Sequence, residues 1–245
     1  MGKYGDVNRY DLLKATAFFI MVIDHLGLYI FTDTFALRAI GRASMPIFAI
    51  LYGYSYKKPN CQILICGIIM SAMSAYFNYH VIPINILYTL YISGFFLKNI
   101  EKRYEAQKKL SIIFYTIMLC LLVLPSAMFI EYGLMILCYM FAAVLIKKED
   151  KCFYDKIMLF IIYISTFVFM CLELFFRLGY CILAASYLAL LFLYLDKKRN
   201  SLFSAIKIKN KIARNTILFC SRYSLYLYVI HITIYMLIAR YAFSK

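Results

Sequence analysis

Two short stretches near the N-terminus hold the residues best suited to chemistry. Asp24 and His25 are adjacent inside the first apolar segment, and Arg42 and Pro46 follow in the second. Ionisable groups at membrane depth cost a few kcal/mol or more each, so they usually face a bundle interior or a water-filled cavity. Two interpretations compete: a polar contact that only holds two helices together, and a catalytic or transport site inside the membrane.

Helical spacing predicts how these residues lie. On one helix, Lys14 and His25 are about three turns apart on nearly the same face, whereas Asp24 points about a quarter turn away. Asp24 is therefore placed to pair with another helix, and Arg42 is the natural partner. Arg38 shares a face with Arg42, because the two are one turn apart. Pro46 predicts a kink beside this site, because proline removes a backbone hydrogen bond.

The composition predicts a membrane protein without a soluble domain. Of the 245 residues, 64% are hydrophobic and the mean hydropathy is +0.77, whereas a soluble domain is about half apolar. Apolar runs long enough to span a bilayer recur along the whole chain. We therefore expect an all-α fold, a polytopic membrane helical bundle that forms a single transmembrane domain over residues 1–245.

The apolar runs predict about nine transmembrane helices. They lie at residues 12–31, 39–56, 61–78, 83–98, 110–128, 132–146, 157–176, 179–195 and 217–240. Lys and Arg are concentrated in alternate connections, above all at residues 197–214. The positive-inside rule then predicts a multi-pass protein with a cytoplasmic N-terminus. In that orientation, Asp24, His25 and the start of the second helix all lie in the outer half of the bilayer.

Net charge and cysteine spacing exclude two other classes of protein. The 27 Lys and Arg against 12 Asp and Glu give a net charge of +15, which in a soluble protein would suggest nucleic acid. Here the cations lie in short loops, where the orientation rule and anionic lipid headgroups account for them, so we expect no nucleic-acid partner. The eight cysteines contain no C-x-x-C pair. Neither a disulfide framework nor a metal site is indicated.

Polar residues on other helices are further candidates for substrate binding. Asn85 lies on the fourth expected helix, Glu131 and Tyr132 start the sixth, and Tyr228 and His231 lie on the last. A lone membrane histidine is more often a hydrogen-bonded packing residue than a catalyst. Both interpretations therefore stay open for His231.

The order of these motifs resembles the TraX family of membrane proteins, relatives of the larger membrane acyltransferase superfamily. The resemblance runs over nearly the full length and is carried by Asp24-His25-Leu26-Gly27, Ile40-Gly41-Arg42, Pro46-Ile47-Phe48-Ala49, Asn85 to Leu90, Glu131-Tyr132-Gly133 and Tyr228 to His231. Two positions depart from the family pattern. Glu131 stands where the family usually has an aspartate, and Val229-Ile230 lacks the proline that often precedes the final histidine.

The resemblance implies acyl transfer in a bacterial inner membrane. Founding members are associated with N-acetylation of a conjugative pilin subunit, and the superfamily moves acyl groups from acyl-CoA to acceptors at the membrane. Acetyl-CoA is thus the expected donor. A pilin-like peptide N-terminus, a glycan hydroxyl or a lipid headgroup is the expected acceptor.

The same resemblance suggests roles for the candidate residues. His25 would be the general base and Asp24 its electrostatic partner. Arg42, together with Arg38, would bind the anionic donor or the oxyanion. The expected substrate-binding set is Arg38, Lys14, Asn85, Glu131, Tyr132, Tyr228 and His231.

Two other classes of function stay open. Asp24, His25 and Glu131 would suit a proton-coupled transporter, although the chain shows no internal repeat of the kind that transporters have. The chain could also be a non-catalytic membrane component of a conjugation or secretion apparatus. Replacement of His25 by alanine separates these classes, because only the enzyme and the transporter need its ring.

Overall fold

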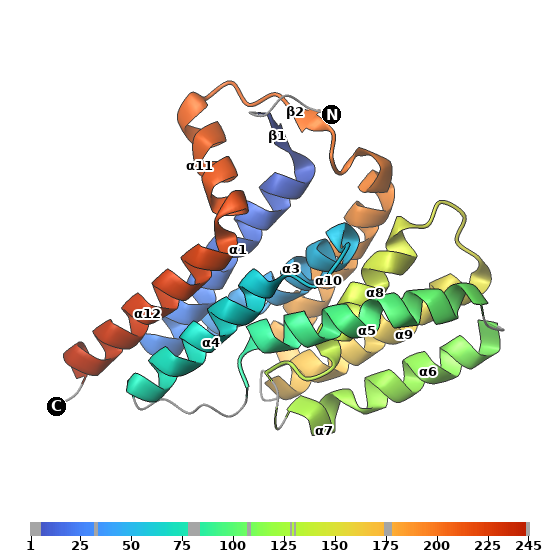
Figure 1. The fold of residues 1–245 in the computed structure, drawn as a ribbon, viewed down its shortest axis with the longest axis horizontal. Coiled ribbons are helices and arrows are strands. Elements are labelled where there is room, and N and C mark those ends of the chain that lie inside the picture. Colours follow the sequence, from blue (N-terminus) through green and yellow to red (C-terminus); the bar gives the residue numbers. More distant parts are fainter. Residues whose placement is uncertain are drawn as a thin grey trace. The chain divides into compact units, whose positions relative to one another are not determined.

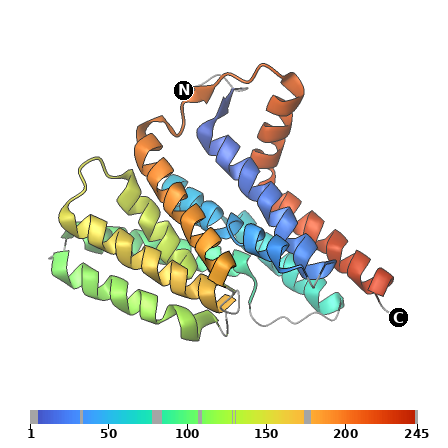
Figure 2. The same cartoon turned by 180° about the vertical axis from the view of Figure 1, so that it is seen from behind.

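The fold is built almost wholly from α-helices (Figures 1 and 2), as the composition predicts. This computed structural model describes residues 6–31, 34–77, 84–106, 109–127, 129, 131–173 and 178–243. Its helices are α1 (Arg9–Tyr29), α2 (Phe35–Gly41), α3 (Ser44–Ser55), α4 (Cys61–Tyr76), α5 (Ile86–Ala106), α6 (Lys109–Leu121), α7 (Val123–Ala127), α8 (Met135–Lys147), α9 (Phe153–Glu173), α10 (Leu178–Lys198), α11 (Lys211–Arg222) and α12 (Ser224–Phe243). A short 3-10 helix, Arg199–Ser201, and two strands, β1 (Val7–Asn8) and β2 (Ala205–Ile206), complete the fold.

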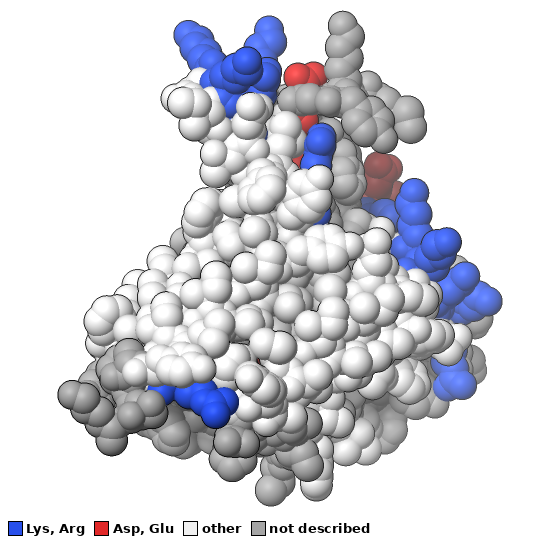
Figure 3. Space-filling view, turned by 60° about the vertical axis from the view of Figure 1, so that its left-hand side comes forward, with Lys and Arg blue, Asp and Glu red and all other residues white. Residues whose placement is uncertain are grey.

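Several of these helices have the length and composition of membrane spans. In the part of the chain that the structure describes, four stretches qualify: Arg9–Tyr29, Phe35–Ser55, Phe153–Leu172 and Ser224–Tyr241. The helices Cys61–Tyr76 and Met135–Lys147 are apolar but shorter. Figure 3 shows that uncharged side chains predominate on the face in view. The count of nine spans stays a prediction, and residues 78–83, from the end of the third expected span to the start of the fourth, lie outside the described residues.

The chain forms two compact units. The first comprises residues 1–48 and 190–245, and the second comprises residues 49–189. The first unit therefore contains α1, α2, α11 and α12, and the second contains α4 to α9, while α3 and α10 pass from one to the other. Sequence analysis predicted a single transmembrane domain over residues 1–245 and did not predict two units.

The first unit is held together at the start of α1. The Asn8 side chain accepts a hydrogen bond from the Asp11 N–H (2.8 Å), and the Asp11 carboxylate accepts one from the Asn8 N–H (3.3 Å). This capping box satisfies N–H groups that the helix leaves unpaired. Just before it, Val7 pairs with Ile206 in the antiparallel β1–β2 ladder. Ser221 of α11 donates to the second oxygen of Asp11 (2.7 Å). The β1–β2 ladder and this hydrogen bond therefore hold the basic segment, residues 197–214, and α11 against the start of α1.

The second expected span, residues 39–56, is interrupted beside the site, as Pro46 predicts. α2 ends at Gly41 and α3 starts at Ser44, so the break lies at Arg42 and Ala43. Arg42 is four residues before Pro46, and a proline cannot donate to the carbonyl four residues back. The discontinuity therefore falls on the arginine itself.

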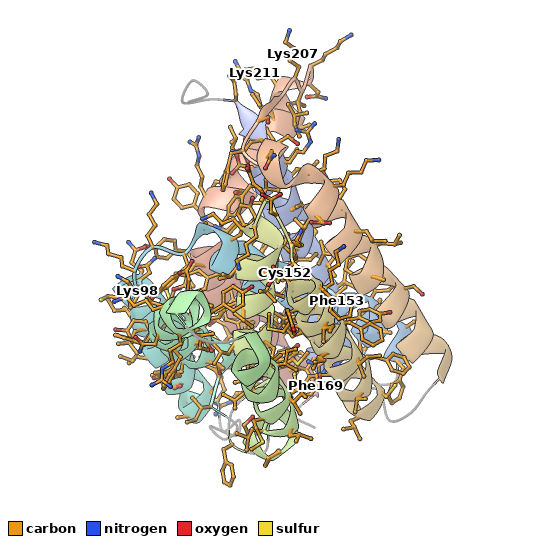
Figure 4. All side chains as sticks on the ribbon, turned by 90° about the vertical axis from the view of Figure 1, so that its right-hand side faces the viewer. Lys98, Cys152, Phe153, Phe169, Lys207 and Lys211 are labelled. Carbon is orange, nitrogen blue, oxygen red and sulfur yellow. The ribbon has the colours of Figure 1, made fainter. Side chains whose placement is uncertain are left out.

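The last expected span, residues 217–240, is two helices. α11 ends with Tyr223 as its C-cap, and α12 follows at once. In α11, Leu218 and Ser221 are buried, whereas Ile212 and Phe219 are exposed. The first residues of the expected span therefore belong to a separate amphipathic helix. Lys207 and Lys211 project at the end of the first unit where α11 begins (Figure 4).

The core of the second unit is α8, which is almost completely buried and lies against α5 and α9. α3 approaches it closely at Gly53. A Cβ atom added there would lie 2.7 Å from the Cα and the carbonyl oxygen of Met140, which are backbone atoms that cannot rotate away. Gly53 is thus required for close packing of α3 on α8.

We expect Gly53→Ala to destabilise the protein by about 1–3 kcal/mol, the usual cost of overpacking. Gly67→Ala is the matched control, because its added Cβ would meet the nearest atom, Leu87 Cβ, at 3.4 Å, an ordinary contact. Thermal unfolding in detergent compares the two variants. Equal midpoints for Gly53→Ala and Gly67→Ala would contradict the close approach.

Candidate functional site

The candidate site lies in the first unit, where α1 packs against α2 and α12 (Figures 1 and 2). Its centre is a pair of histidines. Nδ1 of His25 on α1 lies 2.7 Å from Nε2 of His231 on α12, across a sequence separation of 206 residues. Nδ1 of His231 in turn lies 2.7 Å from the carbonyl oxygen of Leu227. Sequence analysis selected both histidines but did not predict that they touch.

Aromatic rings surround the pair. The ring of Phe18 lies edge-on to His231, with centroids 5.8 Å apart, and Tyr228 lies 6.0 Å from His25. Tyr29 and Tyr235 add further rings, at 6.2 Å from His25 and 5.7 Å from His231. An apolar surround strengthens the hydrogen bonds within it, because water competes less for the donors.

Most of these aromatic residues were missed by the sequence analysis, which singled out Tyr228 alone. Their spacing from the histidines along each helix could have identified them. Tyr228 and Tyr235 lie three residues before and four residues after His231, and Tyr29 lies four residues after His25. Residues at such spacing share a helix face. No local signal could single out the Leu227 carbonyl, because every residue carries one.

Asp24 pairs with the second helix, as its quarter-turn offset predicts. The carboxylate is buried, and its Oδ1 lies 3.2 Å from Nη1 of Arg38. A carboxylate at this depth needs a cation beside it, because burying an unpaired charge costs several kcal/mol. The observed ion pair uses Arg38, which the sequence analysis treated as the secondary arginine. A pairing of Asp24 with Arg42 stays a prediction.

Two glycines allow α1 and α2 to approach closely enough for this ion pair. A Cβ added at Gly41 would lie 2.2 Å from Asp24 Cβ and 2.4 Å from its Cα. One added at Gly27 would lie 2.9 Å from Leu37 Cβ. The helices are therefore in backbone contact at Asp24. The sequence analysis noted both glycines only as parts of motifs, and the structure supplies their physical reason.

Arg42 lies at the break between α2 and α3, directly after the glycine that touches Asp24. α3 begins two residues later at Ser44, which is buried. The first N–H groups of a helix lack intrahelical partners and favour negative charge. The break thus combines an arginine and a helix N-terminus beside the Asp24–Arg38 pair, an arrangement suited to an anionic group.

Lys14 lies three turns before His25 on α1 and close to Asp11. At 1.5 Å per residue, eleven residues separate Lys14 and His25 by about 16 Å along the helix. The two side chains cannot contact the same small group, but they can contact different parts of an extended ligand. The role of Lys14 in substrate binding stays a prediction.

Asn85 and Glu131 belong to the second unit, where they hold the start of α5. The Asn85 amide donates to the Gly67 carbonyl and to the Ser71 hydroxyl, each at 3.0 Å. A Glu131 carboxylate oxygen accepts from the Ile86 N–H at 3.0 Å. These contacts give both residues a structural task that the sequence analysis did not predict. Their proposed contact with substrate stays untested.

Tyr132 has an unusual backbone. Its φ is 60°, and Gly133 follows at 51°. Left-handed φ values are uncommon for residues with a side chain and cost about 1 kcal/mol or more. The Tyr132 side chain is nevertheless buried, against Phe169. Packing in the second unit therefore stabilises this conformation, and a role in substrate binding stays a prediction.

Metal ligands are the last component to consider. Among the residues that the structure describes, no group of three or more His, Cys, Asp and Glu side chains is arranged to hold a metal ion.

Fold and site together define a helical membrane protein whose first helix carries the buried Asp24 and the partly buried His25. A family model described as "TraX protein" matches residues 9–239, and the chain belongs to the TraX family. The resemblance expected from the motifs is thereby confirmed.

A curated relative extends the comparison. "Uncharacterized protein RP591" of Rickettsia prowazekii (strain Madrid E) is 29% identical over 148 residues, covering 58% of this chain and 57% of the relative. The chain therefore matches a little over half the length of that relative. No solved structure matches this chain.

Proposed function

We propose that this protein is an integral membrane acyltransferase that moves an acyl group, in the first instance acetyl, from acyl-CoA to an amine or hydroxyl at the membrane. The observation that carries the proposal is the histidine pair. His25 is partly buried among aromatic rings, 2.7 Å from His231 and next in sequence to the Asp24 of the Asp24–Arg38 ion pair. A positioned histidine is the commonest general base in enzymes.

In this mechanism, the imidazole of His25 takes the proton from the attacking amine or hydroxyl. The nitrogen or oxygen then adds to the thioester carbonyl and forms a tetrahedral intermediate. The carbon–sulfur bond breaks, and the proton passes from His25 to the leaving thiolate, so the products are the acylated acceptor and free CoA. The base is thereby regenerated without any further reactant.

The arginines have separate tasks in the proposal. Arg38 neutralises Asp24 and keeps the carboxylate buried, as the 3.2 Å ion pair supports. Arg42, at the helix break, would hold a phosphate of the donor or the oxyanion of the intermediate. Membership of the TraX family supports acetyl-CoA as the donor and a pilin-like peptide N-terminus as the acceptor.

Acetyl-CoA binding tests the donor. We expect acetyl-CoA to raise the unfolding temperature of the purified protein in detergent, since a ligand at 100 times its Kd stabilises by about 2.7 kcal/mol. The shift should shrink in Arg42→Ala. Arg222→Ala is the matched control, because Arg222 is an exposed arginine on α11.

The outcome separates the classes of function. No stabilisation by acetyl-CoA or by longer acyl-CoA would contradict the proposal. Counterflow of a solute in vesicles would instead favour a transporter. Equal shifts in Arg42→Ala and Arg222→Ala would leave the donor in place but would move its site away from the helix break.

A further inference from the structure

We propose that His231 positions His25 by fixing its tautomer, so that Nε2 of His25 is the atom that takes the proton. This inference rests on the proposed acyl transfer and names the atom and the supporting residue behind it. His231 would then be a positioning residue, in place of the substrate-binding role expected from the sequence.

The Leu227 carbonyl fixes which atom donates in each of the two hydrogen bonds. The Leu227 carbonyl can only accept, so Nδ1 of His231, 2.7 Å away, carries a hydrogen. A neutral imidazole has one N–H, which leaves a lone pair on Nε2 of His231. That atom lies 2.7 Å from Nδ1 of His25, which must therefore be the donor. A neutral His25 then has its own lone pair on Nε2.

The rings around His231 hold it in the orientation that this chain of hydrogen bonds needs. Phe18 and Tyr235 both lie nearly perpendicular to the His231 ring, at 87° and 88°. The His231 ring therefore has edge-type packing contacts with α1 and with its own helix. Rotation of the ring would break both hydrogen bonds and this packing together.

The same logic operates in the Ser-His-Asp triad. There a buried acid accepts the Nδ1 hydrogen of the histidine, and an orienting group that favours the wrong tautomer lowers kcat by about 10⁴-fold. Here a neutral imidazole, itself held by a backbone carbonyl, would be the acceptor. When His25 takes a proton, its hydrogen bond to His231 becomes charge-assisted and therefore stronger. A neutral acceptor stabilises the imidazolium less than a carboxylate does. We therefore expect kcat to fall about 10²-fold when the His231 acceptor is removed.

Nitrogen NMR of the protein with ¹⁵N-labelled histidine tests the tautomer directly. The chain has only three histidines, so the single variants His25→Gln and His231→Gln assign the signals. We expect His25 of the wild type to be protonated on Nδ1 and unprotonated on Nε2. In His231→Leu the acceptor is gone, and the proton should redistribute to Nε2.

Kinetics provide the second readout. His231→Leu should lower kcat for transfer from acetyl-CoA about 10²-fold and leave the KM for acetyl-CoA unchanged. His231→Gln should recover most of the rate, because its amide oxygen can accept from His25. Thr233→Val is the control, because it removes another hydrogen bond from a side chain to a carbonyl four residues back on α12 (Thr233 Oγ1 to Val229, 2.8 Å).

A wild-type His25 protonated on Nε2 would overturn the inference, even if the protein transfers acyl groups. Equal kcat values for the Leu and Gln variants would overturn it as well. Failure of the proposed function has a different signature. A wild-type protein without transferase activity contradicts acyl transfer, and the NMR tautomer then decides the inference by itself.

Discussion

Replacing His25 with alanine is expected to abolish measurable acyl transfer while the protein stays folded and still binds acetyl-CoA. General-base catalysis by a positioned side chain contributes about 10²–10⁴-fold, so the rate should fall by that factor. Folding should survive, because loss of the hydrogen bond from the His25 ring leaves one partly buried acceptor, Nε2 of His231, unsatisfied at a cost of about 1–3 kcal/mol at most.

The measurement is mass spectrometry of an acceptor peptide incubated with acetyl-CoA and purified protein. Leu28→Ala is a suitable control, because Leu28 lies on the same helix but is exposed. Equal rates for His25→Ala and the wild type would show that the histidine pair serves only the packing of α1 against α12. That result would favour the non-catalytic membrane component over the enzyme.

Gly41→Ala is expected to separate α1 from α2 and to break the Asp24–Arg38 ion pair. The added methyl group would lie 2.2 Å from Asp24 Cβ and 2.4 Å from its Cα, so no side-chain rotation can relieve the clash. Once the helices separate, Asp24 is left buried without its cation. Breaking a buried pair in this way costs about 3–5 kcal/mol, and we expect a loss of stability of that order together with weaker acetyl-CoA binding.

A graded series of glycine variants tests this expectation by thermal unfolding in detergent. Gly27→Ala should be milder, because its added Cβ would meet the side-chain atom Leu37 Cβ at 2.9 Å, and Gly67→Ala should be close to neutral at 3.4 Å. The predicted order of stability is Gly67→Ala, then Gly27→Ala, then Gly41→Ala. A stable Gly41→Ala variant with normal acetyl-CoA binding would contradict the backbone contact.

Some properties of this protein follow from the sequence alone. Apolar runs of membrane length predict helices, because the bilayer core leaves no other partner for backbone N–H and carbonyl groups. Ionisable residues inside those runs are costly, which is why Asp24, His25 and Arg38 could be selected without a structure. The quarter-turn offset between Asp24 and His25 also predicted that the carboxylate pairs with another helix.

Other properties needed the tertiary structure. The contact between His25 and His231 joins residues 206 positions apart. The periodicity of one helix shows which of its residues share a face, but it does not show which distant helix packs against that face. Pro46 predicted a kink beside the site, and the structure shows that the helix ends at Gly41 and restarts at Ser44. Asn85 and Glu131 were selected as candidate site residues, and only the structure shows that they also hold the start of α5. Polarity identifies residues that need a partner, and only the packing of helices decides which partner each one finds.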